Sequence, residues 1–187
     1  MTHNELLDEK YKMIIADEAW EKGGRPMGFP TGSVSTDKVI DFLHELMESL
    51  RQVAEMEVQR PKPRDEIIQP LITEQALRIA ISAINGWDIY LAVISLRFQW
   101  SPEGLLKEVI NKLKQKHEDY GNASLIRYGV FGFLVKIHQK IDRLQNLIGS
   151  KGPVDYRETQ NEPVEDTWLD IAGYGILLLM YGRGELD

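Results

Sequence analysis

The sequence predicts an all-α protein, a helical bundle with one substantial core. Apolar residues recur at intervals of three and four through most of the 187-residue chain, which is the period of helices packed on one another. No convincing run of strand-like alternation occurs, and clusters of glycine and proline fall where helices would end. We expect residues 1–60 to form an N-terminal helical extension, which could mediate dimerisation, and residues 73–187 to form the helical core.

The composition excludes several classes of function. The chain has 22 Lys and Arg against 29 Asp and Glu, and its basic residues do not form a run that could follow a nucleic-acid backbone. It has no cysteine, so disulfides, thiolate zinc sites and cysteine nucleophiles are excluded. No signal peptide is visible, and the longest apolar run, residues 176–180, is too short to span a bilayer. We expect a soluble cytoplasmic protein with no nucleic-acid or membrane partner.

The first third of the chain predicts two helices. Residues 6–21 form a short helix that ends in a Gly/Pro-rich loop. Thr36 or Asp37 can cap a long second helix, and Pro61 stops it. Its apolar positions step by four and three, as in a helix packed along another helix: Val39, Leu43, Leu46, Leu50 and Val53.

The middle of the chain predicts a buried segment and then a well-marked helix. Thr73 can cap a helix through Ile84, and the pair at 85–86, Asn-Gly, predicts a break or kink before an apolar run. Ser101 followed by proline and an acid predicts the start of a helix that runs toward His117.

Two long helices are expected at the C-terminal end. The first covers about residues 124–148, and its apolar stripe consists of Val130, Leu134, Ile137, Ile141, Leu144 and Ile148. A polar loop, residues 149–161, separates it from the last helix. If the two helices pack antiparallel across this loop, the C-terminal half of the first faces the N-terminal half of the last.

The last helix begins with carboxylates and ends wholly apolar. Glu162, Asp166 and Asp170 are spaced by four, so they share a face that leads into the core. Buried carboxylates need a compensating cation, which a divalent metal would supply. Alternatively, Glu162, Glu165 and Asp166 favour the helix N-terminus through its dipole, and Asp170 bonds to a basic side chain.

A basic stripe lies on the preceding helix. Lys136, Lys140 and Arg143 follow one margin of its apolar face, and antiparallel packing would place Lys140 and Arg143 near Asp166 and Asp170. The cations could simply pair with the acids. They could also hold phosphate oxygens while the carboxylates hold Mg²⁺.

The turn at residues 118–121 is a second candidate cluster. Glu118 and Asp119 lie at a helix C-terminus, where the dipole opposes negative charge, and an ordinary exposed turn has the same pattern. Tyr120 could stack on a base or sugar, or simply pack. His117 and His138 lack a partner at metal-ligand spacing in the sequence, and we interpret both as structural.

The order of these motifs resembles a known family. The motifs are Asp119-Tyr120-Gly121, Tyr128-Gly129, Lys140-x-x-Arg143-Leu144-x-Asn146-Leu147 and Glu162-x-x-Glu165-Asp166-Thr167-x-x-Asp170-x-Ala172-x-Tyr174. This order resembles the nucleotide-modification-associated domain family common in phages, which looks like a branch of the MazG-like all-α nucleotide pyrophosphohydrolases. The likeness covers roughly residues 113–182.

The resemblance implies a helical core, often dimeric, that hydrolyses a nucleoside triphosphate to monophosphate and pyrophosphate with Mg²⁺. The implied metal ligands are Glu162, Glu165, Asp166 and Asp170; the implied substrate-binding residues are Lys140, Arg143, Tyr120 and Tyr174. Asp119 or Glu118 would orient the attacking water.

One position favours a function other than hydrolysis. Similar sequences tend to have an aspartate before the lysine matched by Lys140, where this chain has Gln139, a neutral and weaker Mg²⁺ ligand. The alternatives are a non-catalytic nucleotide-binding protein or a helical interaction protein.

Overall fold

The computed structural model describes residues 1–24, 35–60, 66–95, 101–149 and 163–186. The described residues are mostly helical and contain no strand, which confirms the all-α prediction. Three parts of the predictions lie outside the described part of the chain: residues 150–161 of the predicted loop, Glu162, and the side chain of Tyr120. The elements are α1 (His3–Ala16), α2 (Thr36–Gln59), α3 (Ile68–Ser95), α4 (Pro102–Tyr120), α5 (Ala123–Ile126), α6 (Gly129–Leu144), the π-helical turn η1 (Gln145–Gly149) and α7 (Val164–Gly182).

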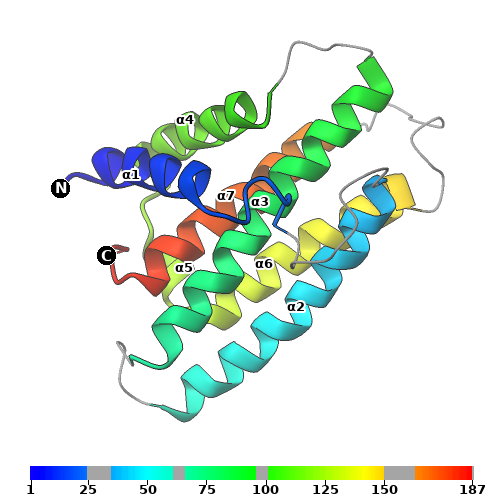
Figure 1. Cartoon of the computed structure of the whole chain (residues 1–187). Helices are drawn as coiled ribbons and strands as arrows, with labels where there is room; N and C mark the ends of the chain where they lie inside the picture. Colours follow the sequence, from blue (N-terminus) through cyan, green and yellow to red (C-terminus); the bar gives the residue numbers. More distant parts are fainter. Residues whose placement is uncertain (25–34, 61–65, 96–100, 150–162, 187) are drawn as a thin grey trace.

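Four long helices form the body of the molecule. Helices α3 and α7 pack along each other, α2 lies along α3 and α6, and α6 also packs on α7 (Figure 1). Helices α1 and α4 contact each other, and α4 reaches both α3 and α7. The buried apolar residues form one connected core. Residues 36–59, which the sequence assigns to the N-terminal extension, line the same core as the helices from residue 73 on.

Helix α7 is buried on nearly every side because it has no polar face after its first turns. Its contact with α3 is unusually close at Gly175, where a Cβ would meet the backbone nitrogen of Ala80 at 2.8 Å. Glycine there lets the two helix backbones approach.

Helix α3 runs without interruption through residues 85–86, where the sequence predicts a break or kink, so the break is wrong. Gly86 lies inside the helix, and the ring of Trp168 occupies the space where a side chain would be; a Cβ at this position would meet that ring at 2.5 Å. The glycine serves packing between helices and does not end one. By length and composition α3 could cross a membrane, but 61% of its apolar window is buried inside the fold, as in core helices of soluble proteins.

The helix predicted over residues 124–148 is divided, which corrects that prediction. A single turn, α5, precedes α6, and Gly129 begins α6 with a φ of 56°. Glu57 of α2 lies against this start: its carboxylate accepts hydrogen bonds from the Val130 amide at 2.8 Å and from the Tyr181 hydroxyl. A carboxylate at a helix N-terminus satisfies an amide with no partner inside the helix. Glu57 therefore joins α2, α6 and α7.

The first helix is fastened to the other end of the chain. Lys10 of α1 is fully buried, and its ammonium lies 2.7 Å from a carboxylate oxygen of Glu185. A buried charge needs such a partner. Figure 1 shows the two termini on the same side of the bundle.

Candidate functional site

Asp170, the centre of the predicted site, lies two turns into α7 and is held by two lysines. Its side chain is only 13% exposed. One oxygen accepts from the Lys140 ammonium of α6 at 2.8 Å, and the other accepts from the Lys116 ammonium of α4 at 2.9 Å. The predicted proximity of Lys140 and Asp170 is confirmed, and antiparallel packing of α6 and α7 produces it. Lys116 was not among the predicted residues.

The charge of Asp170 is stabilised by these partners. Burial alone would raise its pKa, but the hydrogen bonds and positive charges of Lys140 and Lys116 outweigh burial and hold the pKa below the ordinary value. Asp170 is therefore ionised at neutral pH.

The other predicted residues of the two helices are arranged differently. Arg143 donates a hydrogen bond to the hydroxyl of Thr167, which is fully buried one turn before Asp170. Asp166 is exposed, and Glu165 is half-buried at the start of α7. The acidic and basic stripes therefore meet at Asp170.

A pocket of about 290 Å³ opens beside Asp170. It brings together side chains from α1, α4, α6 and α7 and the segment between α4 and α6. Its lining residues are His3, Leu113, Lys116, His117, Gly121, Asn122, Ser124, Leu125, Lys136, Asp170, Gly173, Tyr174 and Leu177. Two predicted site residues, Tyr174 and Asp170, therefore line one cavity, and so does Lys136 of the basic stripe.

The turn after α4 forms one edge of this pocket. Gly121 adopts a φ of 62° and caps α4 through its amide, which donates to the His117 carbonyl at 3.1 Å. This conformation explains the glycine of the Asp-Tyr-Gly motif. Glu118 and Asp119 are exposed and are not among the residues that line the pocket, so the structure does not place the two proposed water-orienting acids in its lining.

Two histidines form another wall of the pocket. The rings of His3 and His117 stack with centroids 3.5 Å apart. Burial, and secondly the charge of His117, lower the pKa of His3. In the described part of the chain, His3 Nε2 and His117 Nδ1 are buried without a hydrogen-bond partner. Buried polar atoms are normally hydrogen-bonded, so a ligand or solvent would have to supply the partner of each nitrogen. His3 was missed because it lies more than 100 residues from the other lining residues in the sequence.

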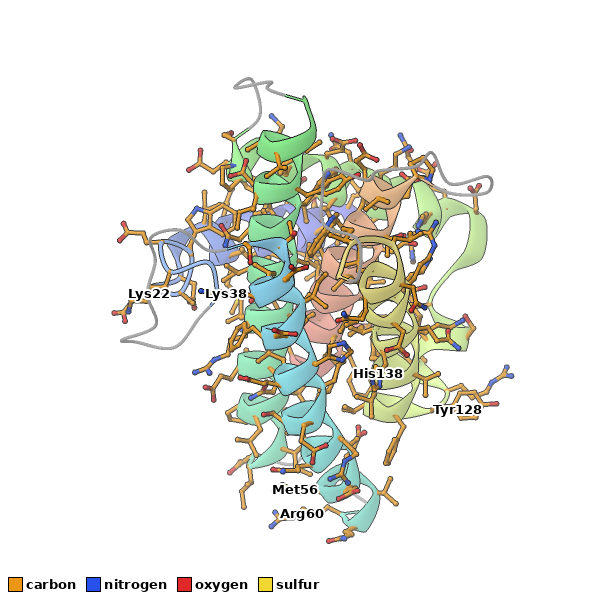
Figure 2. All side chains as sticks on the ribbon, turned by 90° about the vertical axis from the view of Figure 1, so that its right-hand side faces the viewer. Lys22, Lys38, Met56, Arg60, Tyr128 and His138 are labelled. Carbon is orange, nitrogen blue, oxygen red and sulfur yellow. The ribbon has the colours of Figure 1, made fainter. Side chains whose placement is uncertain are left out.

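A second, more apolar pocket of about 520 Å³ adjoins the first. The two share Ser124, Leu125 and Lys136. Tyr128 and Phe131 also line the second pocket, and Tyr128 is 68% exposed. Figure 2 shows Tyr128 projecting from the bundle beside α6.

The carboxylates of α7 do not fit Mg²⁺ as they are arranged. Mg²⁺ requires several oxygen ligands in near-octahedral geometry. Both oxygens of Asp170 accept from lysine ammonium groups, and Asp166 is exposed. Among the described residues, the group of His, Asp and Glu close enough to share an ion lies elsewhere, at His44, His138 and Asp142.

Comparisons with protein-family models, curated proteins and solved structures find no match to this chain. The pocket is lined by two ammonium groups, one ionised carboxylate and two imidazoles, Lys140 reaches the carboxylate from α6, and an apolar pocket adjoins it. Such a site is suited to a ligand that is anionic at one end and flat and apolar at the other.

Proposed function

We propose that the pocket beside Asp170 binds a nucleoside triphosphate through its phosphate groups. The observation that carries this proposal is that two lysines from different helices, Lys116 and Lys140, are held at one carboxylate beside a cavity. Lys136 lines the same cavity, so the described lining residues carry two ammonium groups and one carboxylate, although the whole chain carries −7. A local cationic site in an acidic protein attracts anions, and lysine ammonium groups are common phosphate ligands.

Asp170 positions the lysines in this proposal. Because its two oxygens accept from the two ammonium groups, it fixes where they point and balances part of their charge while the pocket is without an anion. Phosphate oxygens can then replace or join the carboxylate as acceptors. The lysine side chains are 53% and 24% exposed for Lys116 and Lys140, so each can turn toward a ligand.

The adjoining apolar pocket supports a nucleotide over a simple phosphate. A cavity of about 290 Å³ holds phosphates with part of a nucleoside, and ligand pockets of drug-sized molecules start at about 300 Å³. The neighbouring pocket, with Tyr128 and Phe131, offers rings for a base to stack on. Tyr174 lies on the phosphate side of this pair of pockets.

We further propose that the protein hydrolyses the bound triphosphate. The motif resemblance supports a Mg²⁺-dependent pyrophosphohydrolase that releases a monophosphate and pyrophosphate, working in the cytoplasm as a homo-oligomer. The lysine pairing of Asp170 favours the second candidate, a protein that binds a nucleotide without hydrolysing it.

Product analysis separates the two candidates. The protein is incubated with each nucleoside and deoxynucleoside triphosphate and Mg²⁺, and the products are resolved by ion-exchange chromatography. Monophosphate with pyrophosphate supports hydrolysis, whereas a nucleotide-dependent rise in melting temperature without turnover supports binding alone. If no nucleotide is hydrolysed and none raises the melting temperature, both candidates are wrong.

Lysine variants test the proposed contacts. Lys116→Ala and Lys140→Ala should each weaken triphosphate binding roughly tenfold to a hundredfold, because a charge-assisted hydrogen bond contributes about 1.5–3 kcal/mol. Lys107→Ala is the matched control, since Lys107 is exposed on the same α4 helix and belongs neither to the residues that line the pocket nor to the two lysines paired with Asp170. Equal affinity in all three variants would contradict the assignment. Circular dichroism checks that each variant is folded.

A further inference from the structure

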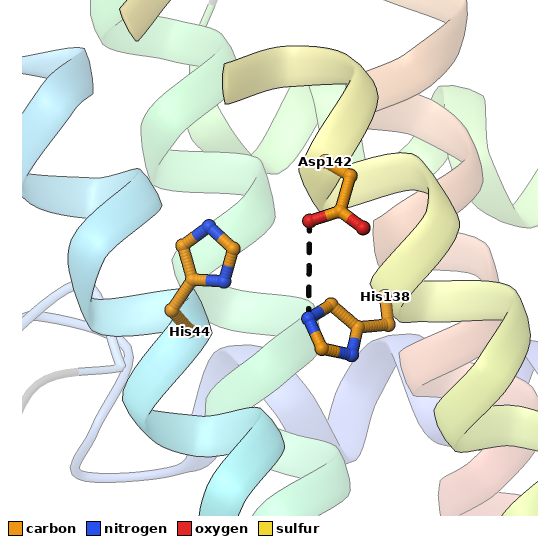
Figure 3. A group of neighbouring side chains, drawn as sticks. All are labelled: His44, His138 and Asp142. Atoms are coloured by element: carbon orange, nitrogen blue, oxygen red, sulfur yellow. Dashed lines mark ion pairs between the residues drawn. The ribbon is translucent and has the colours of Figure 1, made fainter. Parts of the chain in front are cut away.

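The four histidines of the chain lie in two pairs, each formed across helices that are distant in sequence. One pair, His3 and His117, belongs to the pocket described above. In the other, the rings of His44 on α2 and His138 on α6 meet edge to face with centroids 5.8 Å apart. Asp142 lies one turn beyond His138, and its Oδ1 is 3.8 Å from His138 Nε2 (Figure 3).

We propose that His44, His138 and Asp142 bind a divalent transition-metal ion such as Zn²⁺. One ligand atom from each of the three residues lies within 4.8 Å of the others. Figure 3 shows the imidazole of His44 turned toward the α6 pair. The site joins two helices of the bundle and is separate from the nucleotide proposal.

The geometry is close to that of a metal site. Zinc bonds of 2.0–2.1 Å at tetrahedral angles place ligand atoms about 3.4 Å apart. The three atoms therefore need to approach by at most about 1.4 Å from their present separation. The side chains of His138 and Asp142 are 49% and 62% exposed, so rotation about their own bonds can supply this movement without disturbing the core.

The donor set indicates the kind of ion. Two imidazole nitrogens and one carboxylate oxygen suit Zn²⁺, Co²⁺ or Ni²⁺, whereas Mg²⁺ and Ca²⁺ prefer a shell of oxygens. Three protein ligands leave a further position, and the exposure of the α6 residues lets water reach it. The proposed ion is thus chemically distinct from the Mg²⁺ that the motif resemblance implies.

The proposed metal site and the nucleotide pocket lie on different sides of α6. His138 and Asp142 are each two residues from Lys140, which corresponds to about 200° around a helix. Figure 2 shows His138 on the side of α6 next to α2, whereas Lys140 reaches Asp170 of α7. An ion at this site would link α2 to α6 and stabilise the folded chain.

Calorimetric titration of the full chain, purified without a polyhistidine tag, tests the proposal with Zn²⁺ and Co²⁺ alone. We expect one ion per chain, a higher melting temperature with Zn²⁺, and no such effects with Mg²⁺. His138→Ala, Asp142→Ala and His44→Gln should each weaken Zn²⁺ binding at least about tenfold, since even the loss of a group that only orients a ligand costs about ten- to a hundredfold. His44→Gln keeps much of the volume of the partly buried side chain.

The matched control is His117→Ala, which removes one member of the other histidine pair. It should leave Zn²⁺ affinity unchanged. The proposal is overturned if Zn²⁺ does not bind the native chain, if His138→Ala binds it as tightly as the native chain, or if His117→Ala loses it. Because no nucleotide is present, these outcomes are independent of the proposed function.

Discussion

Replacing Asp170 with asparagine tests the centre of the lysine-lined pocket most directly. The substitution keeps the shape of the side chain and removes the negative charge that accepts from Lys116 and Lys140. Two ammonium groups then lie close together without a carboxylate between them. We expect the protein to fold but to be less stable.

The size of this loss follows from the exposure of the three side chains. An exposed ion pair contributes about 0.2–1 kcal/mol, and removing one partner of a fully buried pair costs about 3–5 kcal/mol. Asp170 is 13% exposed, Lys140 24% and Lys116 53%, so the cluster lies between these limits. A loss of about 2 kcal/mol would lower the melting temperature of a chain of this size by about 4–8 °C.

The pH dependence supplies the decisive comparison. The pKa of Asp170 in the folded protein is below its value in the unfolded chain, so its stabilisation is complete above the unfolded pKa of about 3.9. It is lost as the pH falls through the folded pKa. The difference in stability between Asp170→Asn and the native chain should therefore be full at pH 7, by thermal and urea unfolding, and shrink in acid. A difference that is absent at neutral pH, or that grows in acid, would refute the ion pairing.

Three further predictions concern ligand binding and packing. Without Mg²⁺, Asp170→Asn should bind triphosphate more weakly than the native chain, because Lys116 and Lys140 lose the carboxylate that fixes where their ammonium groups point; binding at least as tight as that of the native chain, by fluorescence titration, would contradict the lysine-positioning role. Gly175→Ala should lower the free energy of unfolding by about 1–3 kcal/mol, since its Cβ would meet the backbone of Ala80; an unchanged urea midpoint counts against that close contact. Burial, and then the hydrogen bond and charge of Glu57, raise the pKa of Tyr181. Glu57→Gln should therefore lower that pKa in a spectrophotometric titration, and an unchanged titration would exclude the contact.

The features predicted correctly from sequence are those that local rules determine. The periodicity of apolar residues predicts the helices, and antiparallel packing of the last two predicts that their acidic and basic stripes meet. That packing alone brings Lys140 to Asp170. Lys116 and His3 could not be placed in the same way, because their positions depend on how α4 and α1 pack against α7 and each other.

Glycines show why the remaining predictions failed. The Asn-Gly pair at residues 85–86 is a usual helix breaker, yet Gly86 lies inside α3, where the missing side chain leaves room for Trp168. At Gly129 the apolar periodicity predicts a continuous helix, but the helix is interrupted where Glu57 lies against the backbone. Each outcome is decided by a residue at least 70 positions away. Tertiary contacts of this kind override local preference.

The ion pair between the buried Lys10 and Glu185 has a consequence for ligand binding in the pocket. Helix α1 carries both Lys10 and His3. Because Lys10 pairs with Glu185, His3, which lines the cavity, is connected to the segment that follows α7. A change near residue 185, such as a fused reporter or a neutralising modification, could loosen α1 and alter ligand affinity without touching any lining side chain. The placement of labels and fusion partners therefore becomes a variable in every binding measurement on this chain.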